Sequence, residues 1–172
     1  IASTTSGVSD GSKTNDGTIA LTFTSSEATT NFASGDVSVS GGTLSNFAGS
    51  GTDYTATFTP SGDGATTIDV GASFTDAVGN ANAAATQFNW EYDGTAPTMV
   101  IASTTSGVSD GSKTNDGTIA LTFTSSEATT NFASGDVSVS GGTLSNFAGS
   151  GTDYTATFTP SGDGATTIDV GA

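Results

Sequence analysis

Residues 18–24 read TIALTFT, and residues 53–60 read DYTATFTP. In both stretches an apolar side chain occupies every second position, with mainly threonine between. Side chains of a β-strand point alternately to the two faces of the sheet, so this period of two is typical of a strand with one buried face. The apolar residues are Ile19, Leu21 and Phe23 in the first stretch, and Tyr54, Ala56 and Phe58 in the second.

Weaker versions of the same pattern predict five further strands. Turn residues such as Gly41-Gly42 and Ser61–Gly64 separate them, and the Thr, Ser and Gly bulk of the chain favours strands and turns over helix. About seven short strands, each with one apolar face, predict an all-β fold: an immunoglobulin-like antiparallel β-sandwich. The five strands are expected around Ile1–Ala2, Val37–Val39, Thr43–Phe47, Ile68–Phe74 and Phe88–Tyr92.

The chain contains a perfect internal repeat. Residues 1–72 recur without a change as residues 101–172, which gives a period of 100 residues, the size of a small domain. We expect a first immunoglobulin-like repeat at 1–92, a short linker at 93–98 and a second identical repeat at 99–172 that lacks its C-terminal strand. Pro97 makes the linker fairly stiff. We expect the sequence to be a window from a longer tandem array.

Composition excludes several functions. Of 172 residues, 17 are acidic and two are basic, which gives a net charge of −15, and the chain has neither His nor Cys. A Ser-His-Asp triad, a thiolate nucleophile and a zinc site of N and S ligands are therefore ruled out, and we expect no enzyme and no small-molecule substrate. Two cations cannot neutralise a nucleic-acid backbone. No apolar run approaches about 20 residues, so membrane insertion is not expected.

Several motifs, in order along the repeat, resemble the bacterial immunoglobulin-like repeats of giant surface adhesins. The quoted segments are Thr95-Ala96-Pro97, Ser26-Glu27, Ser40–Ser45 with Tyr54–Pro60, and Thr75–Asn80. Near-identical tandem copies of this length are also similar to the extender region of calcium-dependent adhesins, including a marine ice-binding adhesin. The resemblance implies an extracellular stalk on a bacterial cell surface, with bound Ca²⁺ and with neighbouring identical repeats as its partners.

Acidic and amide side chains of the predicted loops are candidate Ca²⁺ ligands. Ca²⁺ takes six to eight oxygen ligands, and this chain offers oxygen ligands and little else. In an immunoglobulin-like strand order, the loops that carry these side chains lie at the two ends of the sandwich, where successive repeats meet. The alternative interpretation is that Asp before Gly simply forms turns. The candidates are Asp10, Asn15, Asp16, Glu27, Asp76, Asn80 and Asp93, with Asp110, Asn115, Asp116 and Glu127 in the second copy.

Two functions follow as hypotheses. The first is a non-catalytic extracellular spacer stiffened by Ca²⁺ in its loops and at its joints. The second is an adhesion module that binds ice or carbohydrate through the threonine rows Thr55-x-Thr57-x-Thr59 and Thr22-x-Thr24. Such rows are also the ordinary solvent face of a half-buried strand, and a twisted sheet does not offer a flat array.

Overall fold

The computed structural model describes residues 1–171 and divides into two units, Ile1–Thr95 and Ala96–Ala172. The first unit contains β1 (Ala2–Ser3), β2 (Ser12–Thr14), β3 (Ile19–Thr29), β4 (Val37–Ser40), β5 (Gly42–Pro60), β6 (Gly64–Val70) and β7 (Phe88–Tyr92). A single turn of 3₁₀-helix, η1 (Ser34–Asp36), precedes β4. Within residues 1–171 the helices are three residues long, and none has the length and apolar character needed to span a bilayer.

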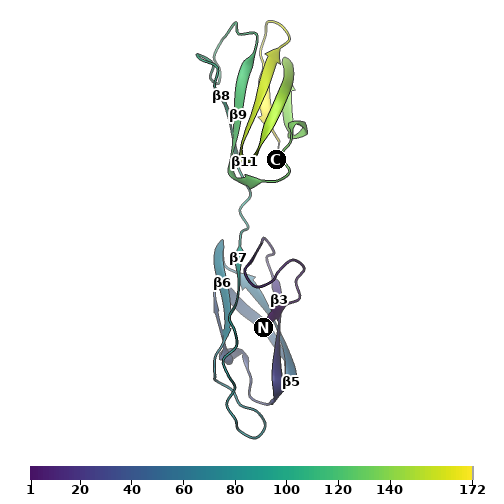
Figure 1. The fold of residues 1–172 in the computed structure, drawn as a ribbon, viewed down its shortest axis with the longest axis vertical. Helices are drawn as coiled ribbons and strands as arrows, with labels where there is room; N and C mark the ends of the chain where they lie inside the picture. The colour runs from purple at the N-terminus through teal and green to yellow at the C-terminus, as the bar shows by residue number, and fades with distance from the viewer. Residues whose placement is uncertain (172) are drawn as a thin grey trace. The chain divides into compact units, whose positions relative to one another are not determined.

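The seven strands of the first unit form two sheets. One sheet has the order β1-β3-β5 and the other β2-β7-β6-β4 (Figure 1). All pairs are antiparallel except β2 with β7, which is parallel. This arrangement is an immunoglobulin-like β-sandwich, and it confirms the fold class predicted from strand number and length.

The core lies between the two sheets. Leu21 of β3 and Phe58 of β5 are almost fully buried, and so are Ile68 of β6 and Trp90 of β7. The Phe58 and Trp90 rings meet edge to face, with centroids 4.8 Å apart. The alternation seen in the sequence therefore places one face of β3, β5, β6 and β7 in the core, and Trp90 of β7 contacts Phe58 of the opposite sheet.

The predicted strands Thr43–Phe47 and Tyr54–Thr59 are confirmed. Both lie in β5, which folds back on itself: Ser45 Oγ donates a hydrogen bond to the Thr57 carbonyl (3.4 Å). The predicted strand Ile68–Phe74 was wrong in its C-terminal bound. β6 ends at Val70 instead of continuing to Phe74. The segment around Lys13, for which no strand was predicted, forms the edge strand β2, because its backbone pairs with β7.

The second unit contains β8 (Met99–Ser103), β9 (Ile119–Thr129), β10 (Val137–Ser140), β11 (Gly142–Pro160) and β12 (Thr167–Val170), with η2 (Ser134–Asp136) before β10. Its sheets have the orders β8-β9-β11 and β10-β12 (Figure 1). Within residues 1–171, the β10-β12 sheet has no strand in the position that β7 takes in the first unit.

Identical residues are consequently buried to different degrees in the two units. Thr66 is 0% exposed beside β7, whereas Thr166 is exposed. Ile68 is fully buried, whereas Ile168 is only half-buried. Residues 112–114, the counterpart of β2, are not in a strand. One strand therefore controls the burial of several distant segments.

Candidate functional site

The end of the first unit from which the linker leaves is held by Asp63. This residue lies in the turn between β5 and β6, and its Oδ1 accepts a hydrogen bond from the Gly94 amide (2.7 Å). Thr95 Oγ1 donates to Asp63 Oδ2. The hydrogen bonds from Thr95 and then Gly94 favour the carboxylate and lower the pKa of Asp63 below its usual value. The first residues of the linker are therefore fixed to the body of the unit.

Lys13 forms two ion pairs at the same end of the first unit. Its Nζ lies 3.0 Å from Asp93 Oδ2 and 3.2 Å from Glu91 Oε1. The hydrogen bond to Asp93, and then that to Glu91, raises the pKa of Lys13 above 10.5. The Asp93 amide also donates to the Thr14 carbonyl (2.9 Å). Asp93, a predicted Ca²⁺ ligand, thus already neutralises a cation within the first unit. We call Asp63, Lys13 and Asp93 with their partners the linker clamp.

The structure does not bring the predicted residues Asp10, Asn15 and Asp16 into one cluster. Asp10 Oδ1 accepts hydrogen bonds from the backbone and side-chain nitrogens of Asn89 (2.8 and 3.0 Å), beside the start of β7. Asp16 Oδ2 accepts from Thr14 Oγ1 (2.6 Å), and Asn15 is exposed. Because β2 runs between Asp10 and Asp16, their carboxylates serve opposite ends of that strand.

Glu27, Asp76 and Asn80 lie together at another place in the first unit. All three line a cavity of about 380 Å³, whose apolar lining includes Phe32 and Phe74. This is the one predicted set whose members the structure places around a common space. Glu27 and Asn80 are exposed and Asp76 is half-buried, so the oxygens are open to solvent.

Asp76 also organises its own turn. Its Oδ1 accepts from the amides of Val78 (2.9 Å) and Asn80 (2.8 Å), and its Oδ2 accepts from Asn80 Nδ2 (2.7 Å). The hydrogen bonds from the Asn80 side chain and backbone lower the pKa of Asp76. The turn-forming role is therefore visible directly, and it keeps the carboxylate ionised.

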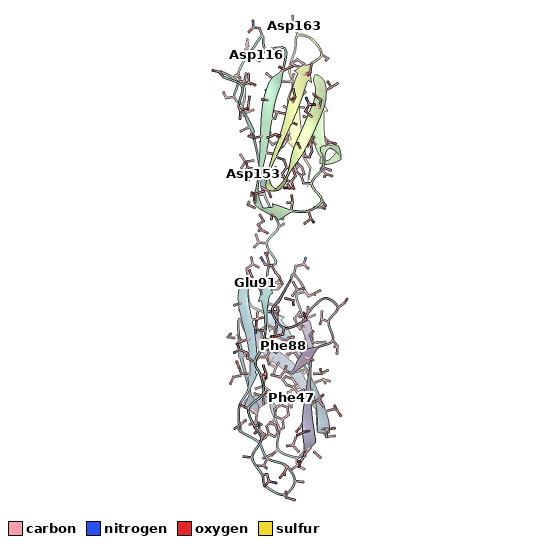
Figure 2. The ribbon with its side chains drawn as sticks, viewed as in Figure 1. Phe47, Phe88, Glu91, Asp116, Asp153 and Asp163 are labelled. Atoms are coloured by element: carbon pink, nitrogen blue, oxygen red, sulfur yellow. The ribbon has the colours of Figure 1, made fainter. Side chains whose placement is uncertain are left out.

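The predicted residues of the second unit remain spread out. Asp110, Asn115 and Asp116 are exposed, and Asp116 accepts a hydrogen bond from Thr114. Figure 2 shows Asp116 and Asp163 at one end of this unit and Asp153 at the other. The half-buried Glu127 donates its amide to Ser125 Oγ (3.5 Å). Over residues 1–171, no three acidic side chains gather closely enough to hold a metal ion by themselves.

Asp63 and Lys13 of the linker clamp are not among the residues predicted from the sequence. The motif Ser61-Gly62-Asp63-Gly64 indicates a turn, and Asp is common in turns. Its partners lie 31 and 32 residues further along the chain. No local pattern connects these positions, so only the juxtaposition of the β5–β6 turn with the end of β7 reveals the contact.

The fold defines the class of protein: tandem immunoglobulin-like β-sandwiches, whose loop carboxylates accept hydrogen bonds that hold the turns and the linker. The sequence profile described as "Bacterial Ig-like domain" matches residues 2–92 and 93–171. The chain therefore belongs to the bacterial Ig-like domain family. Searches of curated proteins and of solved structures found no match. Domains of this family are generally non-enzymatic structural modules and are typical of extracellular or surface proteins.

Replacing Asp63 with alanine is expected to free the Gly94 amide while the first unit stays folded, because the side chain is on the surface. Hydrogen exchange of Gly94, followed by NMR, measures this directly. The matched control is Asp163→Ala, since this sequence has no residues equivalent to Gly94 and Thr95 after the second copy. Unchanged exchange at Gly94 in the Asp63 variant would contradict the clamp.

The same amide should respond to acid. A carboxyl pKa that is lowered on folding contributes stability above the unfolded value of about 3.9, and that contribution disappears as the pH falls through the folded value. We therefore expect Gly94 to lose its protection as the pH falls through the lowered pKa of Asp63, whereas amides of the β3–β5 ladder remain protected.

Proposed function

We propose that the chain is a spacer segment of a bacterial surface adhesin, in which repeated β-sandwiches hold a terminal binding domain away from the cell. The observation that carries the proposal is the unchanged recurrence of residues 1–72 at a period of 100 residues, in a family whose domains are structural modules. A binding or catalytic site needs only one copy, whereas a stalk gains length with each identical unit. Extracellular placement at the cell surface is part of the proposal.

The linker clamp supports a spacer. A stalk needs joints that resist bending, and the clamp fixes Asp93, Gly94 and Thr95 to the first unit through hydrogen bonds and an ion pair. Pro97 then removes a further backbone freedom two residues on. Between Thr95, the last residue of the clamp, and Met99, the first residue of β8, only a few residues have backbone torsions that the clamp does not restrain.

We further propose that Ca²⁺ binds in the polar loops and at the joints. Support comes from the net charge of −15 and from the oxygen side chains Glu27, Asp76 and Asn80 around one cavity. Carboxylates that repel one another gain from a divalent ion. At a free concentration ten times the dissociation constant, one bound ion would add about 1.4 kcal/mol to the free energy of unfolding.

Calorimetric titration of the full chain with CaCl₂, followed by melting and small-angle X-ray scattering with and without a chelator, tests both parts. We expect saturable binding, a higher melting temperature and less bending in Ca²⁺. Identical melting and scattering profiles in the two conditions would contradict stiffening by Ca²⁺. They would leave the metal-independent linker clamp as the source of rigidity.

Two matched variants separate the possible positions of the ion. Glu27→Gln should weaken a site shared with Asp76 and Asn80, whereas Glu127→Gln should not, because residues equivalent to Asp76 and Asn80 are absent from the second copy in this sequence. If the ion binds at the joint, where we propose Asp93 and Glu127 as ligands, Glu127→Gln should weaken binding and Glu27→Gln should not. Asp93→Asn should then weaken binding as Glu127→Gln does. Calcium binding that none of these changes affects would contradict the proposed ligands.

A further inference from the structure

We propose that the side chain of Lys13 competes with Ca²⁺ for the carboxylates of Glu91 and Asp93. The inference rests on the proposed function, because Asp93 is one of the ligands proposed for Ca²⁺ at the joint, and it adds how binding there is controlled. The observation that carries it is the position of the Lys13 ammonium, whose Nζ lies 3.2 Å from Glu91 Oε1 and 3.0 Å from Asp93 Oδ2. A cation of the chain itself therefore lies between the two carboxylates.

Backbone pairing brings Lys13 to this position. β2 runs parallel to β7, in a register that sets Lys13 opposite Glu91 and Thr14 opposite Tyr92. The Asp93 amide continues this contact, because it donates a hydrogen bond to the Thr14 carbonyl (2.9 Å). Both carboxylates reach the same ammonium, so Glu91 and Asp93 lie on the same side of the chain. The arrangement follows from the strand register and does not depend on a chance side-chain contact.

The Lys13 ammonium and a Ca²⁺ ion require the same oxygens. Carboxylates are the preferred ligands of Ca²⁺, and a lysine ammonium is a compact point charge on a flexible stem. Two cations at one place repel each other, so an ion that binds Asp93 and Glu91 has to displace Lys13. The side chains of Lys13 and Glu91 are each 57% exposed, which lets the ammonium move into solvent while β2 stays paired. Occupation by Lys13 therefore lowers the affinity for the ion without blocking it.

No other cationic side chain in the first unit can take the place of Lys13. The chain has two basic residues, and the second, Lys113, belongs to the second unit. The neighbouring carboxylate of Asp63 already accepts hydrogen bonds from Gly94 and Thr95. Lys13 is therefore the counter-ion of Glu91 and Asp93 when Ca²⁺ is scarce, and Ca²⁺ replaces it when the ion is abundant. The first residues of the linker are held by a cation in both conditions.

Titration of the full 172-residue chain with CaCl₂ tests the competition, with the amide signal of Gly94 followed by NMR and total binding by calorimetry. Gly94 adjoins Asp93, so its signal separates binding at the joint from binding at Glu27. In Lys13→Met, which keeps a long stem and removes the charge, we expect the Gly94 response at about threefold to tenfold lower Ca²⁺. Lys13→Arg, which keeps the charge, should behave like the parent chain.

Lys113→Met is the matched control for net charge. It removes one positive charge from the same chain, but this sequence has no residues equivalent to Glu91 and Asp93 after the second copy. The Gly94 response should therefore stay at the parent concentration. Adding Asp93→Asn to Lys13→Met should abolish the gain in affinity, because one of the two contested carboxylates is lost. An equal gain in Lys113→Met and Lys13→Met would overturn the proposal, since it would show a general effect of charge.

The remaining outcomes separate this inference from the proposed function. A Gly94 response that Asp93→Asn weakens and Lys13→Met leaves unchanged would overturn the competition and keep Ca²⁺ at the joint. A response in Lys13→Met with none in the parent chain would support the competition and contradict Ca²⁺ at the joint of the parent chain. The absence of a Gly94 response in every chain would overturn both.

Discussion

Replacing Trp90 with alanine is expected to lower the free energy of unfolding of the first unit by about 3–5 kcal/mol. The side chain is 2% exposed and fills the space between the sheets, against Phe58 at 4.8 Å and Phe88 at 5.7 Å. Its removal leaves a cavity at the point where β7 contacts the opposite sheet. Denaturant unfolding, followed by circular dichroism and by backbone NMR, measures the loss.

Trp90→Phe is the matched control. Trp90 Nε1 is buried without a hydrogen-bond partner, so the native side chain carries an unmet donor. Phenylalanine removes this donor and keeps a ring against Phe58, and we expect it to cost about 1–2 kcal/mol. The second unit contains no tryptophan and serves as an internal reference in both variants. Equal losses for alanine and phenylalanine would contradict the packing role.

Replacing Gly49 with alanine is expected to destabilise the first unit by about 3 kcal/mol, from overpacking and left-handed strain together. Gly49 has φ +137, and an added Cβ would meet the Asp53 carbonyl oxygen and lie 2.5 Å from Tyr54 Cα. These are backbone atoms of the returning half of β5, which cannot move without breaking its pairing with β3. Thermal and denaturant unfolding of the variant measure the effect.

Gly51→Ala separates steric overlap from backbone strain. Gly51 also has a positive φ, +69, but nothing lies within 4 Å of an added Cβ, so only about 1 kcal/mol is expected. Gly149 and Gly151 have nearly the same geometry in the second unit, which provides an independent repetition of the comparison. Equal losses of stability in Gly49→Ala and Gly51→Ala would show that the close approach of backbone atoms within β5 is not the cause of the loss at Gly49.

The strands with an apolar face were predictable from local sequence. Ile19, Leu21 and Phe23 alternate with smaller or polar residues, and all three lie in the core as the alternation indicates. β2 was not predictable, because Ser12, Lys13 and Thr14 have no apolar alternation. Its strand conformation depends on backbone pairing with β7, which begins more than 70 residues later.

The candidate site was predicted only in part. Glu27, Asp76 and Asn80 were selected from the sequence as candidate Ca²⁺ ligands, and the structure places all three around one cavity. Binding of Ca²⁺ there stays a prediction. The separation of Asp10 from Asp16 did not follow, because it depends on the unexpected β2. The contacts of Asp63 with Gly94 and Thr95 depend on which turn meets the end of β7, and local sequence carries no information on that.

By itself, the sequence determined the repeat, the all-β class, the apolar face of each main strand and the absence of His and Cys chemistry. These properties follow from residue type and from the two-residue period of a strand, both of which are local. The tertiary structure alone decided which carboxylates meet which amides. Asp63 and Gly94 lie 31 residues apart in the chain, and they meet because the β5–β6 turn packs beside the end of β7, which no local pattern specifies.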